Sequence, residues 1–204
     1  MIIIVDYGMG NLGSIHNMFR VLNVDSKISS NIDEITNASK LILPGVGSFD
    51  NAMKSLVKMK LIDVLNKKAL IDKIPILGIC LGMQLMLESS EEGLEKGLGW
   101  IKGKVLNFKN QISTEIKTPH MGWNKIDIIN DNLLSKDMLL NSKFYFVHSY
   151  FVKCQFSENV IMNTNYGLDF NSGIRNNNIY GVQFHPEKSH NFGKKLLENF
   201  SKIK

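Results

Sequence analysis

Short runs of apolar residues alternate with amphipathic stretches along the first half of the chain. The runs are continuous, which predicts strands buried on both faces of a parallel sheet, and they cover residues 2–5, 41–43 and 74–79. Each run precedes apolar residues at helical spacing, which predict helices over residues 15–22, 49–71 and 81–88. The first half therefore predicts three strand–helix units, with the strand at residues 2–5 in the centre of the sheet.

The second half of the chain has a different pattern. Its apolar residues mostly alternate with polar ones, which predicts strands of an antiparallel region over residues 105–108, 125–129 and 144–147. A further continuous run predicts a buried strand over residues 179–184, and a closing helix is expected over residues 192–200. We expect an α/β fold in a single domain over residues 1–204: an open, mostly parallel sheet with helices on both faces and an added antiparallel region.

The composition is that of an ordinary globular protein. Of the 204 residues, 44% are hydrophobic and 21% are charged, which excludes a disordered tail or a coiled-coil rod. No apolar run approaches the roughly 20 residues that a membrane span needs, and no basic leader precedes the first run. We expect a cytoplasmic protein without a membrane partner.

Charge and cysteine content exclude several other classes. The net charge is +5, but only Arg20 and Arg175 are arginines, whereas nucleic-acid recognition depends on clustered arginine. Cys80 and Cys154 lie far apart, so neither a disulfide framework nor a zinc site is expected, and we expect a structural role for Cys154. The glycine turn at residues 8–11 lacks the spacing of a dinucleotide site, and the histidines lack that of a metal site. We expect no nucleic acid, no metal and no cofactor.

The segment Gly78-Ile79-Cys80-Leu81-Gly82 has the pattern of a nucleophile elbow. A nucleophile on a sharp strand-to-helix turn needs small residues two positions to each side, because larger side chains would collide with the adjacent strand and helix. The turn also places the sulfur at the N-terminus of a predicted helix, where the macrodipole favours the thiolate. Cys80 is therefore a candidate nucleophile, although taken alone it is equally compatible with a small buried apolar residue.

The segment His185-Pro186-Glu187 follows the last predicted strand. A cysteine nucleophile needs a general base, and the base needs a group that orients it. Residues two apart in extended chain point the same way, so Glu187 can accept a hydrogen bond from one ring nitrogen of His185. Because parallel strands end at the same edge of a sheet, Cys80 and His185 should meet in one crevice. By itself, such a segment more often holds a capping histidine and a solvated acid.

A third segment, Pro44-Gly45-Val46-Gly47, ends the second predicted strand. Acyl transfer through a thioester needs backbone amides for the developing oxyanion, and those of Val46, Gly47 and Leu81 are the candidates. The alternative is an ordinary strand-to-helix turn. His148 ends another predicted strand and is a candidate second base or metal ligand, with a polar strand-end residue as the more frequent alternative.

Together these segments resemble the class I, triad-type glutamine amidotransferases over nearly the whole chain. The resemblance rests on residues 44–47, 78–84 and 181–187. Within that family, further segments are similar to the glutaminase subunits of imidazole glycerol phosphate synthase; they are residues 5–11, 119–124, 145–150 and 185–189.

The resemblance implies a flavodoxin-like fold and hydrolysis of L-glutamine by Cys80 through a glutamyl thioester, with His185 transferring protons and Glu187 orienting it. The ammonia would pass to a cyclase subunit with a (β/α)8 barrel, in a heterodimer that makes imidazole glycerol phosphate and aminoimidazole carboxamide ribonucleotide in histidine biosynthesis. It also implies that Trp123 and Tyr145 face the partner. The residues implied to bind glutamine, partly through main-chain atoms, are Gln84, Glu92, His148, Ser149 and Tyr150.

Two alternatives stay open. Residues 169–174 and 189–193 are similar to paralogues that work with a barrel partner in cell-surface sugar amidation, in which only the ammonia acceptor would differ. A standalone cysteine hydrolase or peptidase would share the elbow cysteine and the histidine, but it would turn over its substrate without a partner.

Overall fold

The computed structural model describes residues 1–111, 116–130, 132–139 and 141–204. Within these ranges the main sheet contains eleven strands. They are β1 (Ile2–Val5), β2 (Ser26–Ser29), β3 (Lys40–Leu43), β4 (Ile76–Ile79), β5 (Ser89–Ser90), β6 (Gly103–Asn107), β8 (Asp127–Ile128), β10 (Tyr150–Cys154), β11 (Val160–Asn165), β12 (Asp169–Asn176) and β13 (Ile179–Val182). Two more strands, β7 (His120–Lys125) and β9 (Lys143–His148), pair antiparallel in a small second sheet.

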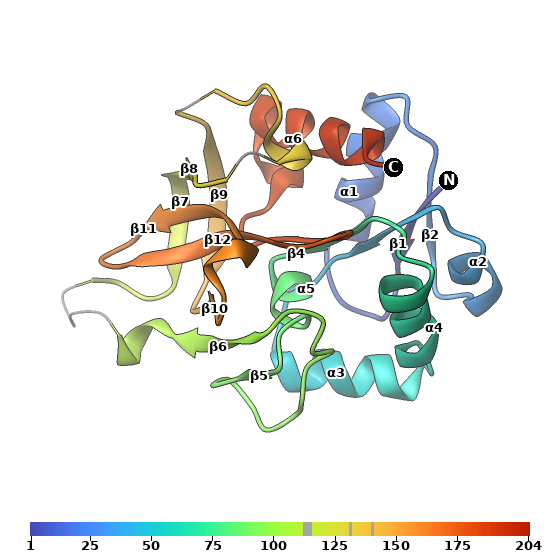
Figure 1. Ribbon diagram of the computed structural model, residues 1–204, viewed down its shortest axis with the longest axis horizontal. Helices are drawn as coiled ribbons and strands as arrows, with labels where there is room; N and C mark the ends of the chain where they lie inside the picture. Colours follow the sequence, from blue (N-terminus) through green and yellow to red (C-terminus); the bar gives the residue numbers. More distant parts are fainter. Residues whose placement is uncertain (112–115, 131, 140) are drawn as a thin grey trace.

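The main sheet has a parallel half and an antiparallel half (Figure 1). Its strand order is β2-β1-β3-β4-β13-β12-β10-β6-β5; β11 also pairs with β12, and β8 pairs with β11. The pairs from β2 to β13 are all parallel, whereas β12 pairs antiparallel with β13, β11 and β10. The predicted α/β class is confirmed. The predicted central place of β1 is wrong, because the strands added beyond β4 leave β1 one strand from the edge.

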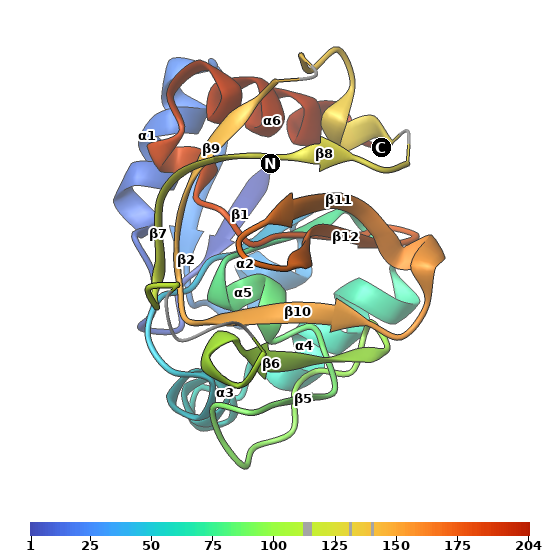
Figure 2. The same cartoon turned by 90° about the vertical axis from the view of Figure 1, so that its left-hand side faces the viewer.

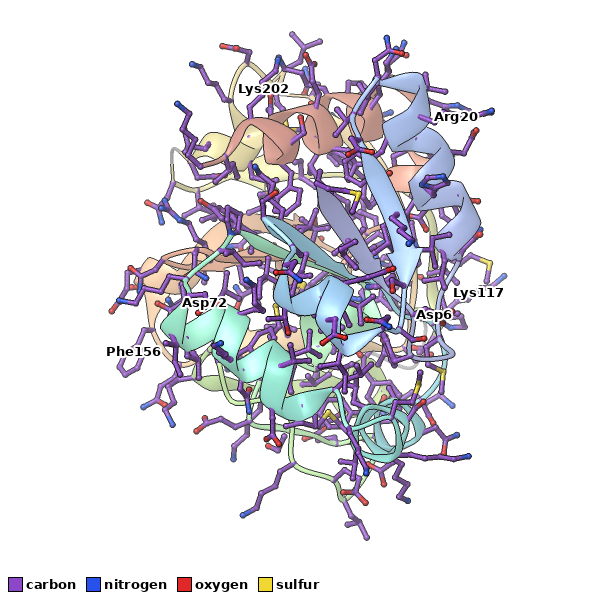
Figure 3. All side chains as sticks on the ribbon, turned by 90° about the vertical axis from the view of Figure 1, so that its right-hand side faces the viewer. Asp6, Arg20, Asp72, Lys117, Phe156 and Lys202 are labelled. Carbon is purple, nitrogen blue, oxygen red and sulfur yellow. The ribbon has the colours of Figure 1, made fainter. Side chains whose placement is uncertain are left out.

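Helices cover both faces of the parallel half (Figures 1 and 2). They are α1 (Leu12–Val21), α2 (Ile32–Thr36), α3 (Phe49–Lys58), α4 (Ile62–Asn66), α5 (Leu81–Gln84) and α6 (His190–Lys202). Because side chains alternate along a strand, Ile2 and Ile4 pack in the cluster under α1 and α6, and Ile3 and Val5 pack in the cluster under α3 to α5. Figure 3 shows Arg20 of α1 and Asp72, beyond α4, on opposite sides of the sheet. Among the described residues, no helix is both long and apolar enough to cross a membrane.

Two predicted helices are shorter than their apolar patterns suggest. The pattern over residues 49–71 is divided into α3, α4 and a π-helical turn at Lys67–Ile71, because Lys60 has a left-handed φ of 57° that ends the first helix. Of the predicted helix over residues 81–88, only Leu81–Gln84 is helical, as α5. Beyond it, the carbonyls of Leu85 and Met86 accept hydrogen bonds from the Leu98 and Ile101 amides rather than from a continuing helix.

The sequence predicted the strands in the second half of the chain less completely. The expected strand over residues 125–129 is divided at Ile126, a buried residue whose amide donates to Ser142 where the chain passes from the small sheet to the main sheet. The pattern did not predict β2, α2 or the β10 to β12 region. Of these, β2 lies at the polar edge of the sheet and β11 and β12 are rich in asparagine, so the apolar signal is weak there.

The first turn of α5 packs directly on the end of β3. A Cβ atom built on Gly82 would lie 1.8 Å from the carbonyl oxygen of Leu43, a distance at which atoms overlap. In α1, by contrast, a Cβ on Gly13 would meet nothing within 4 Å. Only glycine therefore allows β3 and α5 to approach this closely, whereas Gly13 is under no such constraint.

We expect Gly82→Ala to lower the free energy of unfolding by about 3 kcal/mol or more, because the added methyl group forces backbone apart in a packed region. Gly13→Ala is the control and should leave stability unchanged or raise it by up to about 1 kcal/mol, since alanine favours a helix. Urea unfolding of the two variants and the parent makes the comparison. Equal stability of the two variants would contradict the packing argument.

Candidate active site

Cys80 lies on a strained turn between β4 and α5. Its φ of 54° is left-handed, a backbone conformation that is costly for a residue with a side chain and that is often found at functional sites. A Cβ on Gly78 would lie 2.7 Å from the carbonyl oxygen of Gly82. The glycines on both sides of Cys80 thus allow the sharp elbow that the sequence predicted.

His185 and Glu187 stand at the end of β13, the strand that pairs with β4. The register joins Val182 to Ile79, so the chain leaves both strands at the same edge of the sheet. The Nδ1 atom of His185 lies 2.8 Å from Oε1 of Glu187, and each side chain is only 2% exposed. The pair is therefore a buried, hydrogen-bonded unit.

The small second sheet holds the backbone of His185. The His185 amide donates to the Tyr145 carbonyl of β9 at 2.9 Å, and the Ser189 hydroxyl donates to the His185 carbonyl at 2.6 Å. The same hydroxyl accepts a hydrogen bond from the Tyr145 amide. Three hydrogen bonds therefore fix the backbone amides and carbonyls of both His185 and Tyr145.

The protonation of His185 is set by two opposing effects. Burial works to lower its pKa, but the interactions with Cys80 and with Glu187 outweigh burial and raise the pKa to about 10. Its Nε2 atom is buried and has no hydrogen-bond partner among the described residues. The ring is therefore an imidazolium near neutral pH, with one nitrogen engaged by Glu187 and the other available to the thiol and its substrate.

A cavity of about 340 Å³ lies beside Cys80, a volume that suits a small polar molecule. Val46, Gly47 and Leu81 line it, so the three candidate oxyanion amides lie on the cavity that holds the nucleophile. The residues that the sequence associated with glutamine line it as well; they are Gln84, Glu92, His148, Ser149 and Tyr150. Pro119 and Val147 also line the cavity and were not predicted, because nothing in their residue types indicates chemistry.

A comparison with protein-family models finds a match over nearly the whole chain. The family model described as glutamine amidotransferase class-I matches residues 3–203. The chain belongs to the class I glutamine amidotransferases.

Two curated relatives are similar to this amidotransferase over almost their whole length. The imidazole glycerol phosphate synthase subunit HisH 2 of Methanococcus maripaludis is 54% identical over 202 residues, 99% of each chain. The imidazole glycerol phosphate synthase subunit HisH of Bdellovibrio bacteriovorus is 46% identical over 204 residues, 100% of each chain.

Solved structures share the fold at lower identity. A crystal structure of a glutamine amidotransferase has a TM-score of 0.76 at 15% identity and covers 98% of this chain and 99% of its own. The PurLQS structure of Thermotoga maritima has a TM-score of 0.75 at 18% identity, with 98% and 96% covered. The arrangement of strands and helices is therefore that of this family.

A buried glutamine beside the amidotransferase nucleophile was missed by the sequence analysis. The Nε2 atom of Gln183 lies 3.6 Å from the sulfur of Cys80, and its Oε1 accepts a hydrogen bond from Gln84 at 3.1 Å. Gln84 also donates to the Tyr150 carbonyl at 3.0 Å. The signal for Gln183 was present in the sequence as one polar residue within an otherwise apolar buried strand.

The His148 side chain is occupied by neighbouring groups and is not free to act as a base. Its Nδ1 lies 2.8 Å from the Tyr150 carbonyl, and its Nε2 lies 2.9 Å from Nδ1 of His120. The carbonyl can only accept, so these contacts assign the donor at Nδ1 and the acceptor at Nε2. Burial lowers the pKa of His120 to about 4. Burial, with a smaller effect of His120, lowers the pKa of His148 to about 3. No cluster of three metal-ligating side chains occurs in the described ranges.

The Glu92 carboxylate lies at the rim of the cavity and the start of α3. Its Oε2 accepts a hydrogen bond from the Phe49 amide at 2.8 Å. Burial raises the pKa of Glu92 above the usual range for a glutamate, partly offset by that hydrogen bond. The carboxylate is thus held in place while facing a partly desolvated pocket.

Trp123 and Tyr145 form a surface cluster away from the cavity. They face each other across β7 and β9, with ring centroids 6.4 Å apart. His190 stacks on Trp123 at 5.4 Å with the rings nearly parallel, and the Lys188 ammonium lies 5.7 Å from the centre of the Tyr145 ring. Trp123 is 46% exposed, so an aromatic surface is presented to solvent.

We predict that the three buried histidines differ in charge near neutral pH. NMR of nitrogen-labelled histidine should show His185 protonated up to about pH 9 and both His120 and His148 neutral down to about pH 5, because burial and partners shift their pKa values in opposite directions. The raised pKa of His185 adds stability that is lost as pH rises from about 6.5 to 10. The lowered values of the other two make stability fall as pH drops below about 6.5. Titration of all three near pH 6.5 would contradict this assignment.

We also predict that iodoacetamide modifies Cys80 and leaves Cys154 intact at pH 7.5. Cys154 lies outside the cavity, and burial raises the pKa of its thiol to about 12, so almost no thiolate is present there. Mass spectrometry of the peptides after partial alkylation makes the measurement, with Cys80→Ser as the control. Equal labelling of the two cysteines would show that the surroundings of Cys80 do not activate it.

Proposed function

We propose that this chain is the glutaminase subunit of an imidazole glycerol phosphate synthase, which hydrolyses L-glutamine to glutamate and ammonia. One observation carries the proposal: Cys80 lines a cavity of about 340 Å³ and interacts with His185, which is joined to the buried Glu187 at 2.8 Å. The names of full-length relatives at 54% and 46% identity support the assignment to this synthase. Its location in the cytoplasm stays a prediction from the sequence.

In the first half of the reaction, the Cys80 thiolate attacks the side-chain amide carbon of glutamine. The carbonyl oxygen becomes an oxyanion, which the amides of Val46, Gly47 and Leu81 stabilise. When the carbon–nitrogen bond breaks, the His185 imidazolium gives its proton to the nitrogen, so ammonia leaves and a glutamyl thioester remains. The raised pKa of His185 ensures that this proton is present at the start.

In the second half, water attacks the thioester. His185, now neutral, takes a proton from that water, and the oxyanion forms again at the same amides. The carbon–sulfur bond then breaks, the Cys80 thiolate leaves, and glutamic acid loses its proton to solvent. Glu187 holds the ring through both steps and stabilises its positive charge without touching the substrate.

Glutamine binding combines backbone and side-chain groups around the cavity. The side chains of Gln84 and His148 are already bonded to the Tyr150 carbonyl, so they position the strand rather than bind the substrate directly. Ser149 and Tyr150 then offer main-chain groups to the amino acid. The Glu92 carboxylate suits the ammonium group of glutamine. Burial disfavours the charged form of this carboxylate, and a cation bound beside it would stabilise that form.

The surface cluster of Trp123 and Tyr145 is the proposed contact for a cyclase partner with a (β/α)8 barrel. Exposed aromatic residues are enriched at protein interfaces. The Tyr145 carbonyl also bonds to the His185 amide, so the strand that would meet the partner is joined directly to the catalytic base. Ammonia would pass from the cavity to the partner without release to solvent.

One feature of that cluster favours a second candidate for the ammonia acceptor. His190 belongs to residues 189–193, which resemble the paralogues of surface-sugar amidation, and its ring stacks on Trp123. The part of the chain that departs from the histidine-pathway pattern therefore contributes to the proposed partner surface. The glutaminase chemistry would be the same with either partner.

The experiment that tests the proposal measures glutamate formation by the purified chain alone and with the histidine-pathway cyclase of the same organism. The ribonucleotide substrate of the cyclase is added or omitted. We expect little activity alone and strong stimulation by the cyclase with its substrate. Activity only with a different barrel partner would support the sugar-amidation alternative, and full activity without any partner would support a standalone hydrolase.

Within that complex, we expect Cys80→Ala to abolish synthesis from glutamine but to leave synthesis from ammonium salts unchanged, because ammonia is consumed in the partner. Cys154→Ala is the matched control and should retain both activities, since this cysteine lies outside the cavity. Product formation from the two nitrogen sources is the measurement. Loss of both activities in Cys80→Ala would contradict the division of labour between the subunits.

A further inference from the structure

The glycine turn that follows β1 has no role in the chemistry described so far. It begins at Tyr7, whose side chain is fully buried. The Tyr7 hydroxyl donates a hydrogen bond to the carbonyl oxygen of Pro44, the first residue of the loop at residues 44–47. This loop, called the oxyanion loop below, carries the amides of Val46 and Gly47.

The oxyanion loop is enclosed between Tyr7 and the nucleophile elbow. A Cβ atom on Gly45 would lie 2.6 Å from the Tyr7 hydroxyl oxygen and 2.9 Å from the Cβ of Leu81. No side chain therefore fits at Gly45, and the loop backbone packs between Tyr7 and the first turn of α5. Tyr7 is thus in direct contact with the segment that carries the oxyanion amides.

The glycine turn supports the same loop from a second direction. Gly10 has a φ of 101°, and a Cβ there would lie 3.2 Å from Pro44 and 3.3 Å from the Gly45 amide nitrogen. A Cβ on Gly47 would lie 3.6 Å from the sulfur of Met9. The glycine turn at residues 8–11 thus packs against the oxyanion loop.

Tyr7 is itself fixed to the helix that follows the loop. The Ser55 hydroxyl of α3 donates to the Tyr7 carbonyl at 2.5 Å. Through its hydroxyl and its carbonyl, one residue is joined to the start of the oxyanion loop and to α3 at the loop's other end. Burial, and then the nearby charge of Cys80, raise the pKa of the Tyr7 hydroxyl well above its usual range, so the group remains a donor.

We propose that Tyr7 is a positioning residue, which fixes the Pro44 peptide so that the amides of Val46 and Gly47 face the reacting carbonyl beside Cys80. The inference rests on the proposed glutaminase function and deepens it. Tyr7 acts through the loop and does not touch the substrate. Without its hydroxyl, the buried Pro44 carbonyl loses its partner and the loop is free to turn, which weakens stabilisation of the oxyanion.

The test compares Tyr7→Phe with the parent in the complex with its cyclase partner. We expect kcat for glutamine hydrolysis to fall about 10-fold to 100-fold, as for a misplaced group that acts in the transition state. KM for glutamine should change by less than about 3-fold, because ground-state binding does not use the oxyanion. The rate of iodoacetamide alkylation of Cys80 should stay the same, since alkylation forms no oxyanion.

Tyr180→Phe is the matched control. It removes the hydroxyl of another buried tyrosine, on β13, whose ring lies 5.3 Å from the guanidinium of Arg175 on β12, and it should leave kcat unchanged. If Tyr7→Phe does not fold, Ser55→Ala removes the hydrogen bond to the Tyr7 carbonyl instead and should lower kcat in the same direction without altering alkylation.

The results separate the two proposals. An unchanged kcat in Tyr7→Phe, or an equal loss of kcat and of the alkylation rate, would overturn the positioning role. Absence of glutaminase activity in the parent complex would instead overturn the proposed function. A fall in kcat alone, with KM and alkylation preserved, supports the positioning role.

Discussion

The close contact between the Leu43 carbonyl and Gly82 fixes the two halves of the site relative to each other. It holds the end of β3 against the first turn of α5 at a distance that excludes any side chain. The oxyanion loop starts one residue after Leu43, and Cys80 lies two residues before Gly82. Backbone packing, rather than a flexible side chain, therefore sets the position of the nucleophile relative to the amides that would stabilise the oxyanion.

The catalytic base depends on a buried pair of charged side chains, His185 and Glu187. An imidazolium that is 2% exposed is stable only because Glu187 and Cys80 face it from two directions. Removing either partner would leave a buried group without compensation. The His185–Glu187 pair supports Cys80 as the nucleophile. The helix dipole contributes less than the sequence predicted, because α5 is only four residues long and the predicted helix covered residues 81–88.

The small sheet of β7 and β9 connects this buried pair with the surface. Tyr145 contributes its carbonyl to His185 and its ring to the aromatic cluster with Trp123. A displacement of β9 would therefore move the base directly. The buried His120–His148 contact lies on the same two strands, and its neutral histidines complete hydrogen bonds that keep residues 148–150 against the cavity.

The α/β class, the elbow at Cys80 and the order of the site segments could be predicted from the sequence, because they depend on local properties: apolar runs, glycines at fixed spacing and strand ends. Which groups meet is visible only in the folded chain. There, His148 contacts His120, and Gln183 lies beside the sulfur of Cys80. Tyr7 contacts the oxyanion loop although Pro44 is 37 residues away in the chain. Such contacts follow from strand order and register, which bring together residues distant in sequence, and local pattern carries no information about them.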